Sequence, residues 1–207
     1  MSYTTEQESF WAGDFGTDYI QRNQGAALLA ANLNFFSKAL DKAAGVKSCI
    51  EFGANVGMNL KALQLLFPAH EQHAIEINPE AARLLAETIP AANIFQGSIL
   101  EFTPPRQWDL VLIKGVLIHI NPEALPQVYE RLYKASSRYL LVCEYYNPSP
   151  VEISYRGHSQ RLFKRDFAGD LMAAYPDLRL LDYGFAYRHD PCFPQDDITW
   201  FLLEKTR

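Results

Sequence analysis

The stretch VKSCIEFGANVGMNLKALQLLF (residues 46–67) decides the fold of this chain. Its opening residues, 46–52, form an apolar run that predicts a buried strand, and its closing residues, 58–67, have the spacing of a helix. Between them lie Gly53 and Gly57. A glycine can turn sharply and let a ligand lie against the backbone, because it has no Cβ. A strand that turns directly into a helix is the basic unit of an α/β sheet.

Further apolar runs predict six more strands. They lie at 73–77, 93–97, 108–113, 138–146, 178–187 and 198–205. Helices are predicted at 24–44, after Asn78-Pro79, after Asn121-Pro122 and at about 165–175, since Asn followed by Pro is a typical helix start. This alternation predicts a parallel sheet with helices on both faces. The last two strands are joined by only about 10 residues, too few for a parallel crossover, so we expect the final strand to be antiparallel to its neighbour.

The length of 207 residues suits a single domain. We expect an N-terminal helical lead-in over 1–45 and an α/β core over 46–207. An insertion around 144–166, which contains Pro148, Pro150 and Gly157, is predicted as a loop that serves an acceptor site.

Composition excludes several classes of protein. The formal net charge is −5, which disfavours a general nucleic-acid binder. No apolar run approaches the roughly 20 residues of a membrane span, and the polar N-terminus does not resemble a signal peptide. Cys49, Cys143 and Cys192 are too scattered for a disulfide framework, and no His, Asp or Glu cluster has metal-ligand spacing. We therefore expect a cytoplasmic protein without a metal, nucleic-acid or membrane partner.

Residues that follow the strands are the candidates for a ligand site, because ligands bind at the carboxyl ends of strands in α/β sheets. The turn with Gly53, Asn55 and Gly57 is one candidate. Glu76 ends the next strand about 20 residues after Gly53, where a carboxylate can accept both hydroxyls of a ribose. The glycine pair alone is equally compatible with an ordinary strand-to-helix turn. A solvated strand end is the alternative for Glu76, but the flanking Ile75 and Ile77 and the link to the glycine turn favour the ribose contact.

Two later strands add to this candidate site. Ser98 and Ile99 follow the third strand and are placed to meet an adenine edge, although Ser98 alone is more typical of a turn. Lys114 and His119 follow the fourth strand, where packing does not require either residue. His119 is either a ligand-contacting residue or a structural histidine that is hydrogen-bonded beneath the next helix.

These motifs together resemble those of the class I S-adenosylmethionine (SAM) dependent methyltransferases. The resemblance covers residues 46–205 and rests on EFGANVG, AIEINP, GSIL and DLVLIKGVLIHINPE. More narrowly, the chain is similar to the pseudaminic acid biosynthesis-associated methylases. That similarity is carried by FGTDYIQRN (15–23), KGVLIHINPE (114–123), CEYYNPSPVEISYRGHSQRLFKRDF (143–167) and FPQDDITWFLLEK (193–205).

The resemblance implies a Rossmann-like sheet of seven strands with the last strand antiparallel, and SAM as the cofactor. It implies that Gly53 and Gly57 line the methionine portion of SAM and that Glu76 holds the ribose hydroxyls. Ser98 and Ile99 would flank the adenine. Many class I enzymes have an Asp where Ser98 stands, so the adenine amine would lose a charged acceptor here. Lys114 stands at a position that varies between families and opens the active-site face.

The N-terminal lead-in is a candidate lid. Tyr19, Arg22 and Asn23 could lie over the SAM site and exclude water. We expect Tyr19 and Asn23 to contact the cofactor, and Arg22 to pair with its carboxylate or with an acidic substrate. A structured helix with surface polar residues is an equally good interpretation.

The only basic cluster of this acidic chain lies within 144–166. We expect the acceptor to contact Tyr146, Tyr155, Arg156, Lys164 and Arg165. Arginine and lysine among tyrosines suit an anionic, hydroxyl-rich molecule such as a sugar acid or sugar nucleotide. The alternative is a solvated, charged surface.

Methyl transfer to a hydroxyl needs a base, and histidine suits near-neutral pH. His119 and His158 are the candidates, with Tyr145 as an orienting group. The sequence thus predicts a SAM-dependent methyltransferase for a small, anionic, sugar-like acceptor. A SAM-binding accessory protein and a methyltransferase for another small metabolite remain alternatives. A nicotinamide-dependent oxidoreductase is disfavoured by the absence of GxGxxG, and a protein or nucleic-acid methylase by the compact length and the net charge.

Overall fold

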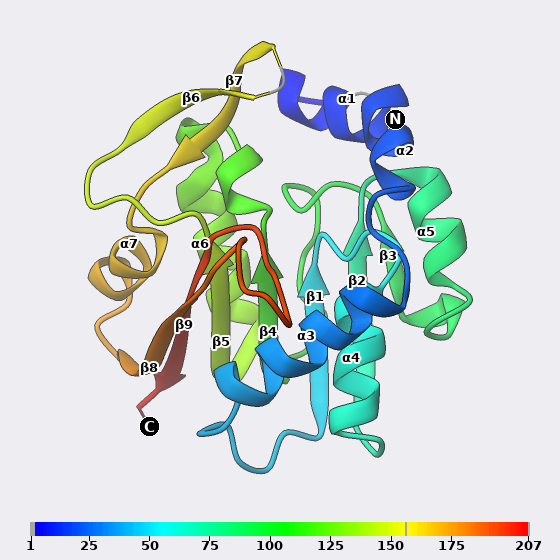
Figure 1. Cartoon of the computed structure of the whole chain (residues 1–207). Helices are drawn as coiled ribbons and strands as arrows, with labels where there is room; N and C mark the ends of the chain where they lie inside the picture. Colours follow the sequence, from blue (N-terminus) through cyan, green and yellow to red (C-terminus); the bar gives the residue numbers. More distant parts are fainter. Residues whose placement is uncertain (1–2, 156, 207) are drawn as a thin grey trace.

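The centre of the molecule is a seven-stranded sheet in the order β3-β2-β1-β4-β5-β9-β8 (Figure 1). The structure is a computed structural model that describes residues 3–155 and 157–206, without the side chains of residues 158 and 159. The strands of the sheet are β1 (Ser48–Phe52), β2 (Glu71–Glu76), β3 (Ile94–Gln96), β4 (Trp108–Lys114), β5 (Ser136–Glu144), β8 (Leu178–Ala186) and β9 (Ile198–Lys205). The first five are parallel, and β9 is antiparallel to both of its neighbours. The predicted α/β sheet with an antiparallel final strand is confirmed.

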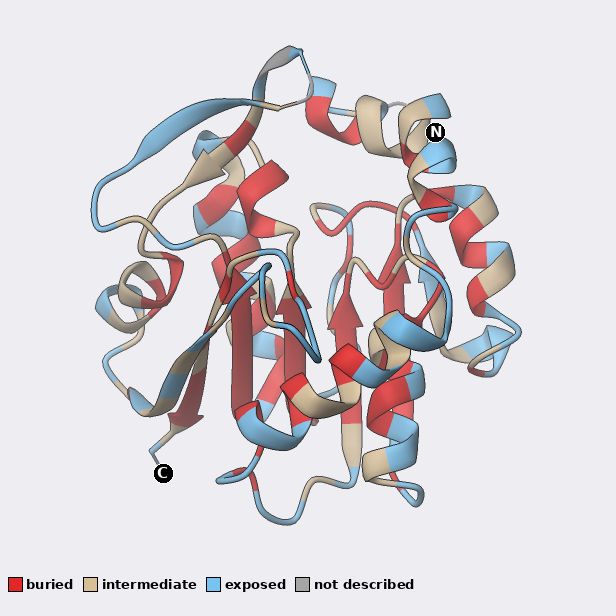
Figure 2. Cartoon of the chain, in the orientation of Figure 1, coloured by how far each residue is buried: buried red, intermediate tan, exposed pale blue. Residues whose placement is uncertain are grey.

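Helices cover both faces of this sheet. They are α3 (Ala26–Ala39), α4 (Met58–Leu66), α5 (Pro79–Leu85), α6 (Leu125–Ala135) and α7 (Phe167–Ala174), with short 3-10 turns η1 (Ala91–Asn93), η2 (Leu117–His119) and η3 (Pro122–Ala124). The central strands are buried along most of their length (Figure 2). In β4, Leu110 and Leu112 pack in the core cluster of α3 and α4, while Val111 and Ile113 pack in that of α6 and α7. Burial on both faces explains why β4 is apolar without alternation.

The N-terminal segment forms two short helices, α1 (Glu6–Ala12) and α2 (Asp14–Ile20), which lie across the carboxyl ends of the central strands (Figure 1). The side chain of Thr5 accepts a hydrogen bond from the Glu8 amide, and the Glu8 carboxylate accepts one from the Thr5 amide. This reciprocal cap fixes the start of α1. Asn78 Nδ2, at the start of α5, donates to the Trp11 carbonyl at 3.2 Å and so ties the segment to the sheet layer.

One part of the prediction was wrong. The segment after β5, expected as a loop, contains an antiparallel hairpin of β6 (Val151–Tyr155) and β7 (His158–Lys164). Pro148 and Pro150 suggested a loop, but both precede the first strand, so they do not interrupt its ladder. The hairpin reaches α1, where Gln7 Nε2 donates to the Gln160 carbonyl at 3.0 Å. Within the described residues, no helix is long and apolar enough to cross a membrane.

Candidate active site

A cavity of about 440 Å³ lies at the carboxyl ends of the central strands, below α1 and α2. Its volume falls within the range of small-molecule sites. Eleven of the residues expected from the sequence line it. They are Tyr19, Asn23, Gly53, Asn55, Glu76, Ser98, Ile99, Lys114, His119, Tyr145 and Tyr155. The parallel strands bring these residues together because their carboxyl ends meet at one edge of the sheet.

The turn after β1 forms the floor of the cavity. Gly53 has φ +79° and Asn55 has φ +49°, both in the left-handed region. A Cβ on Gly53 would lie 2.6 Å from Cγ2 of Val116, so glycine is needed both for the turn and for the close approach of the loop after β4. The amides of Gly53 and Ala54 donate to the Ile75 carbonyl at 2.9 and 3.0 Å, which ties the turn to β2.

Gly57 is not among the residues that line the cavity. It precedes α4 with φ +81°, and a Cβ there would lie 2.6 Å from Cδ1 of the buried Leu85. The second glycine of the turn therefore allows α4 to pack against α5. The expected contact with the methionine portion of a cofactor has no counterpart in the cavity lining.

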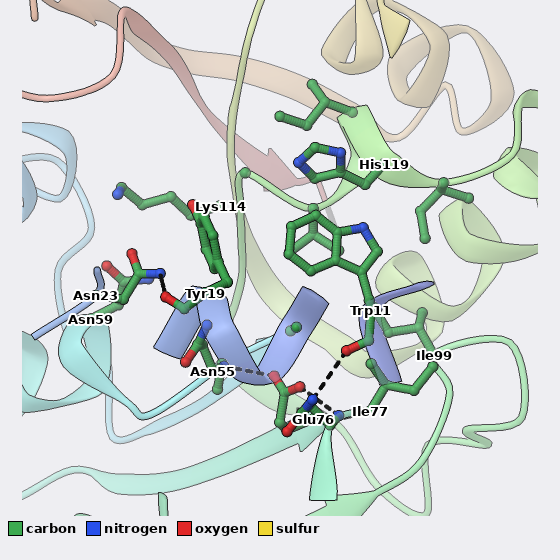
Figure 3. A pocket seen from close by; sticks show the side chains of 18 of the residues that line it. Trp11, Tyr19, Asn23, Asn55, Asn59, Glu76, Ile77, Ile99, Lys114 and His119 are labelled. Atoms are coloured by element: carbon green, nitrogen blue, oxygen red, sulfur yellow. Dashed lines mark hydrogen bonds between the residues drawn. The ribbon is translucent and has the colours of Figure 1, made fainter. Parts of the chain in front are cut away.

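Glu76 ends β2 and presents its carboxylate to the cavity (Figure 3). Its two oxygens accept hydrogen bonds from the amides of Asn55 and Asn78, each at 2.7 Å. A carboxylate has about four acceptor positions, so others remain for a ligand. Burial raises the pKa of Glu76, and the backbone hydrogen bonds lower it in part.

Ser98 is held by α1. Its hydroxyl donates to the Glu8 carboxylate of α1 and accepts from the Leu100 amide at 3.0 Å. Burial raises the pKa of Glu8, but hydrogen bonds from Ser98, Thr4 and Thr5 outweigh it and leave this pKa lowered. Sequence reasoning missed Glu8, although the spacing of Thr5 and Glu8 has the signature of a capping box.

Lys114 ends β4 and lines the cavity beside Phe35, whose ring centre is 5.5 Å from its Nζ. Burial lowers the pKa of this lysine, while Cys143 and Glu51 act in the opposite direction. No described carboxylate lies within ion-pair distance of its ammonium. The cavity therefore contains a positive charge that is available to an anionic group.

Two buried carboxyl groups, those of Glu51 and Glu144, lie near Lys114, and the sequence analysis assigned neither of them a role. Glu51 accepts from Asn59 Nδ2 at 2.6 Å, and its other oxygen has no hydrogen-bond partner within the described chain. Burial raises the pKa of Glu51 to about 8. Glu144 accepts from the amides of Val116 and Leu117 at 3.0 and 2.9 Å, while burial raises its pKa to about 7. Glu144 thereby shapes the loop that leads to η2.

His119 is the last residue of η2 and is 8% exposed. Its Nδ1 lies 2.5 Å from the Arg161 carbonyl of β7, which can only accept, so Nδ1 carries the proton and Nε2 has a free lone pair. Burial lowers the pKa of His119 to about 4, which keeps the ring neutral. Its ring lies 4.6 Å from that of Trp11 (Figure 3) and 5.0 Å from that of Tyr155, between ring centroids, and His119 lines the cavity. His119 is thus hydrogen-bonded to β7 rather than beneath the next helix, and it lines the cavity; its contact with a ligand stays a prediction.

Tyr145 and Tyr146 follow β5 directly, and their side chains lie in different surroundings. Tyr145 lines the cavity, and burial raises its pKa. Tyr146 is 42% exposed, with its ring 5.9 Å from that of Phe201. Arg22, expected to pair with a carboxylate, is exposed and does not line the cavity.

The described members of the basic cluster also lie outside the cavity lining. Arg165 Nε lies 3.3 Å from the carboxylate of Asp170, and Lys164 Nζ is 5.1 Å from the ring centre of Tyr145. Arg156 and the side chain of His158 lie outside the described residues, so their expected roles stay predictions.

Among the residues that the structure describes, no group of three or more His, Cys, Asp or Glu side chains is placed to hold a metal ion. No protein-family model matches the chain, and no curated protein matches it. The narrower similarity to the pseudaminic acid-associated methylases therefore stays a prediction.

Solved structures of SAM-dependent methyltransferases share the fold. The 1,6-didemethyltoxoflavin-N1-methyltransferase of Burkholderia thailandensis, with bound substrate and S-adenosylhomocysteine, has a TM-score of 0.73 and 17% identity over 100% of this chain and 92% of its own. The magnesium protoporphyrin IX methyltransferase of Synechocystis PCC 6803, with bound SAM, has a TM-score of 0.69 and 12% identity over 100% of both chains. The mitomycin 7-O-methyltransferase MmcR has a TM-score of 0.69 and 17% identity, and this chain covers 61% of its length. The likeness establishes a class I methyltransferase fold.

Proposed function

We propose that this protein is a SAM-dependent methyltransferase that acts on a small-molecule acceptor. The observation that carries the proposal is the buried carboxylate of Glu76, which faces the cavity beside the glycine turn of Gly53 and Asn55. A carboxylate with acceptor positions left over suits the two hydroxyls of a ribose. When bound, SAM supplies a methyl group that is already activated by its sulfonium.

The cavity residues suit the parts of this cofactor. In this proposal Glu76 holds the ribose, and Ser98 and Ile99 flank the adenine. Gly53, Asn55, Tyr19 and Asn23 surround the methionine portion; the side-chain amide of Asn23 donates to the Tyr19 carbonyl at 3.1 Å, which orders the end of α2. The unpaired ammonium of Lys114 suits the methionine carboxylate.

His119 is the proposed base. Its Nδ1 is fixed by the Arg161 carbonyl, and its Nε2 can receive a proton from an acceptor hydroxyl in the cavity. Tyr145 lines the same cavity and is the proposed orienting group. Glu144 acts as a positioning residue, because it binds the amides of the loop that carries His119.

The sequence suggested an anionic, sugar-like acceptor. Of the described lysine and arginine side chains, Lys114 and Arg188 line the cavity, whereas Arg22, Lys164 and Arg165 do not. The observations support a small acceptor, and the expected contacts with an anionic sugar gain no support from the described side chains. The solved methyltransferases of this fold likewise act on small molecules, such as 1,6-didemethyltoxoflavin.

Calorimetric titration with S-adenosylhomocysteine tests which cofactor the protein binds, and a separate titration with NADH is the comparison. We expect S-adenosylhomocysteine to bind and NADH not to bind; the reverse result would make the protein a candidate oxidoreductase. Incubation with methyl-labelled SAM and a metabolite extract then tests turnover by mass spectrometry. Cofactor binding with no labelled product from any extract would favour the accessory-protein alternative.

A further inference from the structure

One end of the cavity is walled by aromatic rings. Trp11 comes from α1, His119 from η2 and Tyr155 from β6, so three separate segments contribute to this wall. The ring centroid of His119 lies 4.6 Å from that of Trp11 (Figure 3) and 5.0 Å from that of Tyr155. Phe15 of α2 extends the cluster, with its ring 6.1 Å from that of Tyr155. This end differs from the end where Glu76 presents its carboxylate.

Three side-chain polar groups of the aromatic wall are placed to meet a ligand: the indole N–H of Trp11, Nε2 of His119 and the hydroxyl of Tyr155. The indole N–H of Trp11 is buried and has no hydrogen-bond partner in the described chain. Nδ1 of His119 is taken by the Arg161 carbonyl, which leaves Nε2 as its acceptor. A molecule with hydroxyls all round would bury more polar groups here than the wall can pair, and each buried unpaired group weakens binding. A flat molecule with one donor and one acceptor would satisfy Nε2 of His119 and the N–H of Trp11, and would pack its faces against the rings.

The charges near the aromatic wall also favour an uncharged acceptor. Burial lowers the pKa of His119 to about 4, so its imidazole brings no positive charge to the wall at neutral pH. The described basic side chains of the 144–166 segment have other neighbours, Arg165 with Asp170 for example. The guanidinium of Arg161, the cation beside this wall, is paired with Glu6 at 3.0 Å, so a carboxylate placed here would have to compete with Glu6 for it. A buried charge without a partner is very costly.

From these observations we infer that the methyl acceptor is a flat aromatic or heteroaromatic molecule whose acidic hydroxyl, phenolic or enolic, donates to Nε2 of His119. The inference rests on the proposed function. In the reaction the acceptor O–H bond breaks and its proton passes to Nε2, while the new O–CH₃ bond forms. The S–CH₃ bond breaks, and its electron pair stays on sulfur to give a neutral thioether.

The basicity of His119 is consistent with such an acceptor. A neutral imidazole whose conjugate acid has a pKa of about 4 is a weak base. A phenolic or enolic hydroxyl is more acidic than a sugar hydroxyl and gives up its proton to such a base more readily.

The test uses the full chain saturated with S-adenosylhomocysteine. The probes are 7-hydroxycoumarin, 4-hydroxyquinoline and 3-hydroxyflavone; coumarin lacks the hydroxyl, and N-acetylneuraminic acid represents the sugar acids. Calorimetry or quenching of tryptophan fluorescence gives each Kd. We expect at least one hydroxylated probe to bind at least about tenfold more tightly than N-acetylneuraminic acid, and 7-hydroxycoumarin to bind more tightly than coumarin.

A pair of variants locates the site. Tyr155→Leu should weaken binding of the best probe by about threefold or more, because an aromatic contact is lost. Tyr183→Leu makes the same change on β8 at a side chain that is 64% exposed and outside the cavity lining, and it should change nothing. The Kd of S-adenosylhomocysteine serves in both variants as the check of an intact cofactor site.

Each outcome has a definite meaning. Failure of S-adenosylhomocysteine to bind would remove the proposed function, and the inference with it. Binding of S-adenosylhomocysteine combined with tighter binding of the sugar acid, or with no binding of any flat probe, would overturn the inference alone. Equal losses in Tyr155→Leu and Tyr183→Leu would also overturn it, because the aromatic wall would then not be the site.

Discussion

Replacement of Glu76 by glutamine tests the core of the site without changing its shape. In the native chain the two carboxylate oxygens accept from the amides of Asn55 and Asn78, each at 2.7 Å. The glutamine oxygen can keep one of these bonds, but its NH₂ group then faces the other amide, donor against donor. Loss of one hydrogen bond to a charged acceptor costs about 1.5–3 kcal/mol. We expect Glu76→Gln to lower the free energy of unfolding by about that amount.

The same change should weaken the cofactor site more selectively. A carboxylate can accept both ribose hydroxyls, whereas the remaining amide oxygen of Glu76→Gln is already engaged with a backbone amide. We expect the Kd of S-adenosylhomocysteine to rise by about 10- to 100-fold, which corresponds to one lost charge-assisted hydrogen bond.

Urea denaturation and calorimetric titration measure the two effects separately. Glu80→Gln is the matched control. Glu80 lies in the first turn of α5, the helix that follows Glu76, and its carboxylate pairs with Arg83 at the surface, 2.8 Å away. It should change neither the stability nor the Kd by more than a few tenths of a kcal/mol. A folded Glu76→Gln protein with an unchanged Kd would remove Glu76 from the cofactor site, and an unchanged stability would refute the hydrogen-bond argument.

Gly57→Ala should lower the unfolding free energy by about 2–4 kcal/mol, because its φ is +81° and its Cβ would lie 2.6 Å from the buried Leu85; equal urea midpoints for both proteins would contradict this. Glu51 has a folded-state pKa raised by burial from 4.5 to about 8, so it contributes stability at low pH that is lost as pH rises across that range. Glu51→Gln should therefore reduce the fall of stability from pH 5 to 8, by up to about 1.4 kcal/mol per pH unit, and an unaltered slope would argue against a raised pKa. Glu8→Gln removes the charged acceptor that holds Ser98 to the lid, so S-adenosylhomocysteine should dissociate about tenfold faster in stopped-flow measurements. An unchanged dissociation rate would show that α1 does not close the site.

The sequence was most informative where a local pattern has a local cause. The run from 46 to 67 predicted strand, turn and helix correctly, because apolar spacing and glycine conformations act over a few neighbouring residues. The position of Glu76 at a strand end predicted its place on the cavity for the same reason. The hairpin of β6 and β7 differs from the predicted loop, because the two prolines that indicate a loop lie just before its first strand.

Local pattern could not reveal which of two similar residues serves the site. Gly53 and Gly57 look alike in the sequence, yet the first allows the approach of Val116 at the cavity and the second makes room for Leu85 between two helices. The difference depends on contacts with residues far along the chain.

The sequence by itself determined the alternation of strands and helices, the antiparallel last strand and the carboxylate at the end of β2. These features follow from burial period, turn chemistry and connection length, all of which are local. The tertiary structure decided which distant groups meet, as Glu8 meets Ser98 and His119 meets the Arg161 carbonyl. It also left the described lysine and arginine side chains of the 144–166 segment outside the cavity lining and brought the rings of Trp11, His119 and Tyr155 together there, because packing places side chains through contacts that no local pattern encodes.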